Sequence, residues 1–71
     1  MIKNRIKVLR AEKNWTQEDL ARKVGVSRQT INSIERGKFF PSVVLALKIA
    51  RVFNLKVEDV FYLVEEEEVN D

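Results

Sequence analysis

Residues 16–37 read TQEDLARKVGVSRQTINSIERG, and this stretch decides the fold because it encodes two short helices joined at one glycine. Thr16 can cap the first helix, since its side-chain oxygen accepts from a free amide of the first turn, and Asp19 completes a capping box. Gly25 ends that helix in the left-handed conformation, which costs glycine no Cβ clash. Ser27 then caps a second helix. So short a link makes the helices cross steeply, as in a helix-turn-helix.

The side chains of this stretch sort into an inner and an outer face. Ala21 is small enough for close approach of the helices, and larger apolar side chains fill the angle between them: Leu20, Val24, Val26, Ile31 and Ile34. At ~100° per residue, the outer face of the second helix holds only residues that can donate hydrogen bonds. These residues are Arg28, Gln29, Asn32, Ser33 and Arg36.

Such a polar face has two interpretations. Arginine matches the O6 and N7 edge of guanine, whereas glutamine and asparagine match the N6 and N7 edge of adenine, so a helix bearing them is suited to the DNA major groove. A merely solvated face is the commoner case for an arbitrary helix. The glycine hinge favours the DNA-reading interpretation.

The motifs resemble the Cro/cI-type, or XRE-type, helix-turn-helix family of bacterial, phage and archaeal regulators. The resemblance is carried by TQEDLA at 16–21, GVSRQTI at 25–31, and IERGK at 34–38 followed by PS at 41–42, and it spans roughly residues 4–63. It implies a recognition helix at about residues 28–36 whose base-reading side chains are Arg28, Gln29, Asn32 and Ser33. The residues it assigns to DNA phosphates are Thr16, Gln17, Ser27, Arg36 and Lys38. Free amides at helix N-termini attract anions, which agrees with the phosphate assignment.

The resemblance also assigns structural residues. Ala21 and Gly25 shape the hinge, and Arg10 and Glu35 form a buried ion pair in relatives that carry both. Phe39 and Phe40 depart from the polar residues usual in this loop, and we expect one to pack under the loop and the other to be partly exposed.

The whole chain predicts an all-α fold, a compact five-helix domain like that of lambda repressor, with the helix-turn-helix at helices two and three. The first helix is expected over residues 4–13 with Asn4 as its cap, and the fourth over 43–53, apolar almost all round and central to the core. A short fifth helix follows Lys56. Residues 61–64 are aromatic and β-branched, so they either pair as a strand with residues 1–3, as in short relatives, or fray with the other terminus.

The amino-acid composition limits the kinds of function that this chain can have. The 71 residues suffice for one domain, and the chain holds no cysteine and no histidine, so we expect no disulfide, metal ion or cofactor and no catalytic site. No segment resembles a signal peptide or a membrane span, which predicts a cytoplasmic protein. We therefore expect a binding protein and not an enzyme, and no second fold that would bind a small-molecule effector.

Charge is unevenly distributed along the chain. All thirteen lysines and arginines lie in residues 1–64 with only six of the eleven acids, a net charge of +7, whereas residues 65–71 carry the other five acids and no base. We therefore divide the chain into a DNA-binding domain, residues 1–64, and an acidic C-terminal tail, residues 65–71, that keeps the domain soluble.

The expected partner is double-stranded DNA. The leading hypothesis is a sequence-specific transcriptional regulator, most simply a repressor, that binds a palindromic operator as a homodimer formed through the fifth helix and the C-terminal segment. The alternative is an antitoxin-like or other protein-interaction module with the same fold. It is disfavoured because the polar face lacks the aromatic or aliphatic anchors of protein interfaces.

Overall fold

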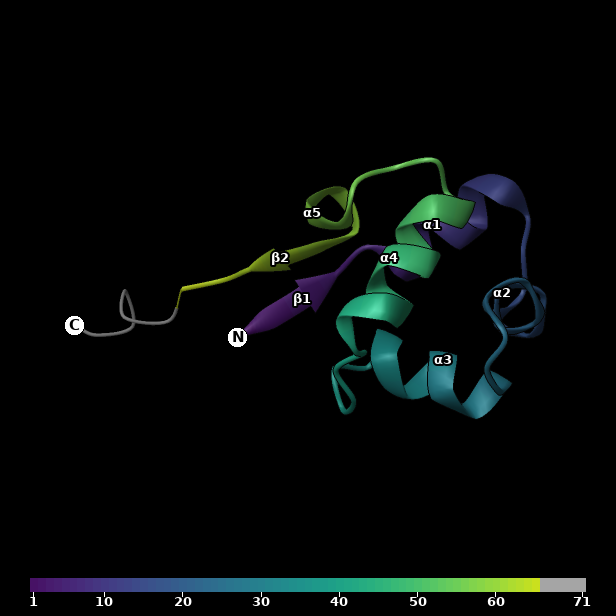
Figure 1. The fold of residues 1–71 in the computed structure, drawn as a ribbon, viewed down its shortest axis with the longest axis horizontal. Coiled ribbons are helices and arrows are strands. Elements are labelled where there is room, and N and C mark those ends of the chain that lie inside the picture. The colour runs from purple at the N-terminus through teal and green to yellow at the C-terminus, as the bar shows by residue number, and fades with distance from the viewer. Residues whose placement is uncertain (66–71) are drawn as a thin grey trace.

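The computed structural model describes residues 1–65 and contains the five expected helices with a small antiparallel sheet (Figure 1). In chain order the elements are β1 (Ile2–Asn4), α1 (Ile6–Lys13), α2 (Gln17–Val24), α3 (Arg28–Glu35), α4 (Val43–Val52), α5 (Val57–Val60) and β2 (Phe61–Leu63). Of the acidic tail expected at 65–71, only Glu65 lies within the described residues.

The hinge between α2 and α3 has the expected local structure. Thr16 Oγ1 accepts from the Asp19 amide at 3.0 Å while Asp19 Oδ2 accepts from the Thr16 amide at 2.9 Å, so the capping box is complete. Gly25 ends α2 with φ of 78°, and its amide donates to the Ala21 carbonyl at 2.8 Å. Ser27 Oγ accepts from the Thr30 amide at 3.1 Å and so caps α3.

One hydrophobic core lies beneath the hinge. Its fully buried larger side chains come from every helix: Ile6, Leu20, Ile31, Ile34, Ile49 and Val60. Ala21 is 2% exposed, which is consistent with close approach of α2 to its neighbours. Trp15 covers this core from outside, with its ring centroid 5.3 Å from that of Phe53. The buried faces of α2 and α3 therefore meet as their periodicity predicts.

The two ends of the described chain pair and do not fray. Ile2 lies opposite Leu63 and Asn4 opposite Phe61, and the Val64 amide donates to the Met1 carbonyl at 2.8 Å. Figure 1 shows this strand pair projecting from the helical body, away from α2 and α3. The expectation that residues 61–64 form a strand with the N-terminus is confirmed, although the partner strand extends to Asn4.

The start of α1 differs from the expectation. The helix begins at Ile6 and not at residue 4, because Asn4 belongs to β1. Its side chain still serves the helix: Asn4 Oδ1 accepts from the Ile6 amide at 3.1 Å, and Nδ2 donates to the Ile34 carbonyl at 3.0 Å. Asn4 thus ties the sheet, α1 and the end of α3 together.

One expectation about burial is wrong. Phe39 and Phe40 are 47% and 56% exposed, so neither packs under the loop, because the residues between α3 and α4 run over the surface. The fourth helix contributes Ile49 and Ala50 to the core, as expected, whereas Val43 and Leu47 are 75% and 54% exposed. A domain of this size covers only one face of such a helix. No helix among residues 1–65 is long and apolar enough to cross a bilayer.

Candidate nucleic-acid interface

The outer face of α3 gathers the four residues predicted to read bases. Ile31 and Ile34 anchor the inner face in the core and are at most 1% exposed. On the other side Arg28 and Gln29 are exposed, and Asn32 and Ser33 are half-buried. The structure therefore brings the predicted set together on one polar surface of α3, fixed by buried side chains behind it.

A largely buried ion pair lies behind this surface. Arg10 Nε donates to Glu35 Oε2 at 2.6 Å and Arg10 Nη2 to Glu35 Oε1 at 3.1 Å, and the two side chains are only 14% and 7% exposed. Arg10 Nη1 also donates to the Trp15 carbonyl at 2.9 Å. The guanidinium thus joins the end of α1, the start of α2 and the last turn of α3, and its charge is matched inside the fold.

Gln17 connects that ion pair to the outer face of α3. Its Nε2 donates to Glu35 Oε1 and to Asn32 Oδ1, both at 3.1 Å, and its Oε1 lies 3.4 Å from Arg28 Nη1. Both side-chain hydrogens of Gln17 are therefore used within the protein, and its main-chain amide is the donor left for a phosphate. Sequence reasoning missed this network because it depends on the crossing geometry of α2 and α3.

The other residues predicted to hold phosphates surround α3. Thr16 and Ser27 stand at the N-termini of α2 and α3, where main-chain amides face outward, and both hydroxyl oxygens already accept a capping bond. Arg36 and Lys38 follow α3 and are exposed. Gly37 between them has φ of 75°, which turns the chain so that the Lys38 amide donates to the Ser33 carbonyl at 2.9 Å.

Acidic groups are also present at the start of α2. The Thr16 main-chain amide and hydroxyl hold the pKa of the Asp19 carboxyl below its ordinary value, and the nearby Arg22 lowers it further. Asp19 is therefore a carboxylate across the physiological range, and it occupies the Thr16 amide. The first turn of α3 has no acidic residue. Its outward amides therefore attract an anion with less electrostatic repulsion than those at the start of α2.

Two residues outside the predicted set border the α3 surface. Phe39 and Thr30 line a shallow hollow of about 360 Å³ together with four of the predicted residues: Ser27, Gln29, Ser33 and Lys38. The Thr30 hydroxyl lies 3.0 Å from Ser27 Oγ. The position of Phe39 has no sequence signal, because it depends on how the loop folds back beside α3.

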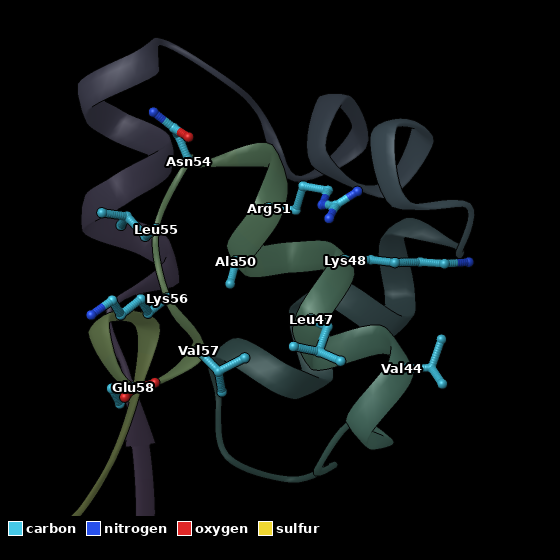
Figure 2. Close-up of a pocket in the computed structure, with 10 residues that line it drawn as sticks. All are labelled: Val44, Leu47, Lys48, Ala50, Arg51, Asn54, Leu55, Lys56, Val57 and Glu58. Carbon is cyan, nitrogen blue, oxygen red and sulfur yellow. The ribbon is translucent and has the colours of Figure 1, made fainter.

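A second hollow, of about 800 Å³, lies on the opposite part of the fold between α4 and α5 (Figure 2). Leu47, Ala50 and Val57 point toward the space between the two elements, whereas Lys48 points away from it. Five of its ten lining residues are apolar, and the other five are polar or charged. Within residues 1–65, no three His, Cys, Asp or Glu side chains group as metal ligands would.

Comparisons with known proteins agree with this geometry. A helix-turn-helix family model matches residues 6–60. An HTH-type transcriptional regulator of Methanocaldococcus jannaschii is 56% identical over 66 residues, which cover 93% of this chain and 100% of that protein. The HTH-type transcriptional regulator YgzD of Bacillus subtilis is 52% identical over 65 residues, covering 92% of this chain and 98% of YgzD.

A solved structure extends the comparison to a DNA complex. SinR, the master regulator for biofilm formation, was solved in complex with DNA and matches with a TM-score of 0.68 at 35% identity, over 75% of this chain and 86% of the SinR chain. The SinR N-terminal DNA-binding domain from Bacillus subtilis matches with the same score and identity.

Proposed function

The chain belongs to the XRE-type helix-turn-helix family of transcriptional regulators, and on this basis we propose that it is a repressor that occupies a palindromic DNA operator as a homodimer. The observation that carries the proposal is the outer face of α3. Four hydrogen-bonding side chains, Arg28, Gln29, Asn32 and Ser33, share one surface that buried isoleucines hold in place. A helix presented in this way fits the major groove, where such side chains distinguish base pairs.

Phosphate contacts would set the position of α3 in the groove. Arg36 and Lys38 lie just beyond its C-terminal end, and the amides at its Ser27 end face outward, so both ends of the helix offer groups that bind anions. We assign backbone contacts to these groups and to Thr16 and Gln17 at the start of α2, where Gln17 acts through its main-chain amide. Such contacts make affinity fall as salt rises.

The homodimer is supported by exposed apolar side chains that lie outside α3. Val44 and Leu47 on α4 are 62% and 54% exposed, and Leu63 on β2 is 76% exposed. A stable interface buries roughly 800 Å² on each partner, with an apolar centre. We propose that the dimer forms through α5 and the C-terminal segment, with the exposed face of α4 beside them.

The alternative of an antitoxin-like module that binds another protein is weaker. Protein interfaces are commonly anchored by aromatic or aliphatic side chains in central pockets, and the outer face of α3 has no such residue. The exposed apolar residues on α4 and β2 suit a second copy of the chain. We further propose that residues 1–64 act as the DNA-binding unit in the cytoplasm, without an effector, and that residues 65–71 keep it soluble.

The proposal is tested by selecting binding sites from a random duplex pool and then measuring variants on the selected operator. Arg28→Ala removes an exposed cation from the outer face of α3, and Lys13→Ala removes one from the last turn of α1. We expect Arg28→Ala to lower specific affinity by about 1–3 kcal/mol and Lys13→Ala to leave it within about 0.5 kcal/mol. Equal losses from the two variants would contradict base reading by α3.

A further inference from the structure

Phe39 lies at the edge of the polar surface of α3, where it lines the hollow of about 360 Å³ beside that helix. The ring is 47% exposed, so an apolar group meets water next to side chains that are proposed to read bases. Phe40, the next residue, is 56% exposed but is not among the residues that line the hollow. Of these two neighbouring phenylalanines, Phe39 is therefore the one that shares a surface with α3.

The end of α3 fixes where Phe39 lies. The Gly37 amide donates to the carbonyl of Ile34, a core residue, at 3.0 Å. The Lys38 amide donates to the Ser33 carbonyl at 2.9 Å. These bonds hold the first residues of the loop against the last turn of α3, and Phe39 is the next residue along the chain. Its position beside the reading surface is therefore set before DNA binds, as a residue that determines specificity requires.

The hollow combines polar and apolar groups. The Ser27 and Thr30 hydroxyls lie 3.0 Å apart, and Ser27 Oγ also accepts from the Thr30 amide at 3.1 Å, so these two residues bond each other. Gln29 and Ser33, one turn apart on α3, bring side chains that can donate to the polar edge of a base. Phe39 adds an apolar ring to the same hollow. A base edge that fits here therefore has an acceptor and an apolar group side by side.

Thymine has this combination in the major groove. Its O4 accepts a hydrogen bond and its C5-methyl group is apolar, whereas cytosine presents the N4 donor and has no methyl group. Phenylalanine is one of the side chains that make apolar contact with this methyl group. A ring inserted between base steps is instead typical of proteins that kink DNA from the minor groove, and Phe39 borders the helix that is assigned to the major groove.

We propose that Phe39 is a specificity-determining residue, which contacts the C5-methyl group of one thymine in each half-site while Gln29 or Ser33 bonds O4 of that base. This inference rests on the proposed function, which places α3 in the major groove of a palindromic operator. The contact removes the methyl group and part of the exposed ring from water together. Covering one methyl group raises affinity about threefold, so the two half-sites together contribute about tenfold.

Uracil substitution tests this contact, because uracil differs from thymine only by the missing C5-methyl group. Each thymine of the selected operator is replaced by uracil, at equivalent positions of both half-sites. The expected result is one position at which uracil weakens wild-type binding about tenfold. At that position Phe39→Ala should bind the two duplexes within about twofold of each other, whereas Phe40→Ala, the matched control, should keep the tenfold preference of about one order of magnitude. Phe39→Leu, which keeps an apolar side chain, should retain a preference of about threefold.

Three results would overturn the inference and leave the proposed function in place. Wild-type protein that binds uracil as well as thymine at every position reads no methyl group. A thymine preference that Phe39→Ala keeps belongs to another side chain, and a loss that is equal on thymine and uracil duplexes indicates contact with the DNA backbone. Both phenylalanines are exposed, so the urea midpoints of the variants should match that of the wild type. Failure to select any duplex would instead refute the proposed function, and the inference with it.

Discussion

Replacing Glu35 by alanine tests how the fold holds α3 in place. The Glu35 carboxylate accepts from Arg10 at 2.6 and 3.1 Å and from Gln17 at 3.1 Å, so the substitution removes the partner of a guanidinium that is 14% exposed. Breaking a buried pair by removing one member costs about 3–5 kcal/mol. A chain of 71 residues has a total stability of about 4–11 kcal/mol at 0.05–0.15 kcal/mol per residue, so we expect Glu35→Ala to lose a large part of its free energy of unfolding.

The chain contains its own control for this prediction. Arg22 bonds Asp19 at 2.8 Å, a similar distance, but the Arg22 side chain is 65% exposed. Water screens such a pair, so Arg22→Ala should cost less than about 1 kcal/mol. Because the two ion pairs have similar distances, the difference between the two losses of stability reports the effect of burial.

Equilibrium urea denaturation, followed by circular dichroism at one fixed protein concentration, measures both losses. Fixed concentration matters because association would add to apparent stability. The double variant Arg10→Met/Glu35→Leu, which replaces the pair by apolar side chains, should recover most of the stability lost in Glu35→Ala. A loss below about 1 kcal/mol for Glu35→Ala, equal to that of Arg22→Ala, would refute the reasoning.

Four further predictions concern separate parts of the molecule. Gln29→Ala should weaken operator binding by about 1–3 kcal/mol without changing the urea midpoint, and a shifted midpoint would give Gln29 a structural role. Gly25→Val should lower the free energy of unfolding by about 1–3 kcal/mol through its left-handed φ alone, because no atom lies within 4 Å of a Cβ built there, and Gly25→Asn should cost less; equal values would contradict this. Folding lowers the pKa of Asp19, so the stabilisation by its carboxylate should be complete above pH 3.8, the ordinary pKa, and lost as the pH falls through the lowered pKa. Asp19→Asn should therefore make the free energy of unfolding depend less on pH in the acid range, and an unchanged pH dependence would argue against the capping box. Leu63→Ser and Leu47→Ser should each raise the dimer dissociation constant at least about tenfold in analytical ultracentrifugation. Val8 on α1 is 53% exposed, and Val8→Ser should leave this constant unchanged. A monomeric wild-type protein would remove the basis of this prediction.

The helix-turn-helix was predictable because its determinants are local. Thr16, Gly25 and Ser27 act on amides and carbonyls a few residues away, so spacing in the chain is enough to place both helix ends. The inner face of α3 follows from helical periodicity for the same reason. The strand at 61–63 was predictable as a strand from its aromatic residues and the β-branched Val64 that follows, while its register with Asn4 depends on how the helices bring the two ends together.

Three other features that depend on tertiary geometry were not predictable. Apolar composition alone placed the fourth helix at the centre of the core, yet Val43 and Leu47 are exposed because a small domain has too few elements to cover both faces. The exposure of Phe39 and Phe40 depends on the path of a loop. Gln17 was assigned to phosphate by resemblance, and its bonds to Asn32 and Glu35 become visible only when α2 and α3 are placed against each other.

The most direct test of the central claim is the ratio of two affinities. One is the affinity of the wild-type protein for the selected duplex, and the other is its affinity for a duplex of equal length in which both half-sites are scrambled, measured at one physiological salt concentration. The proposed function predicts half-sites one helical turn apart and a ratio of at least about 10³. Equal affinity for the two duplexes would show that the outer face of α3 does not read sequence, and it would contradict the account.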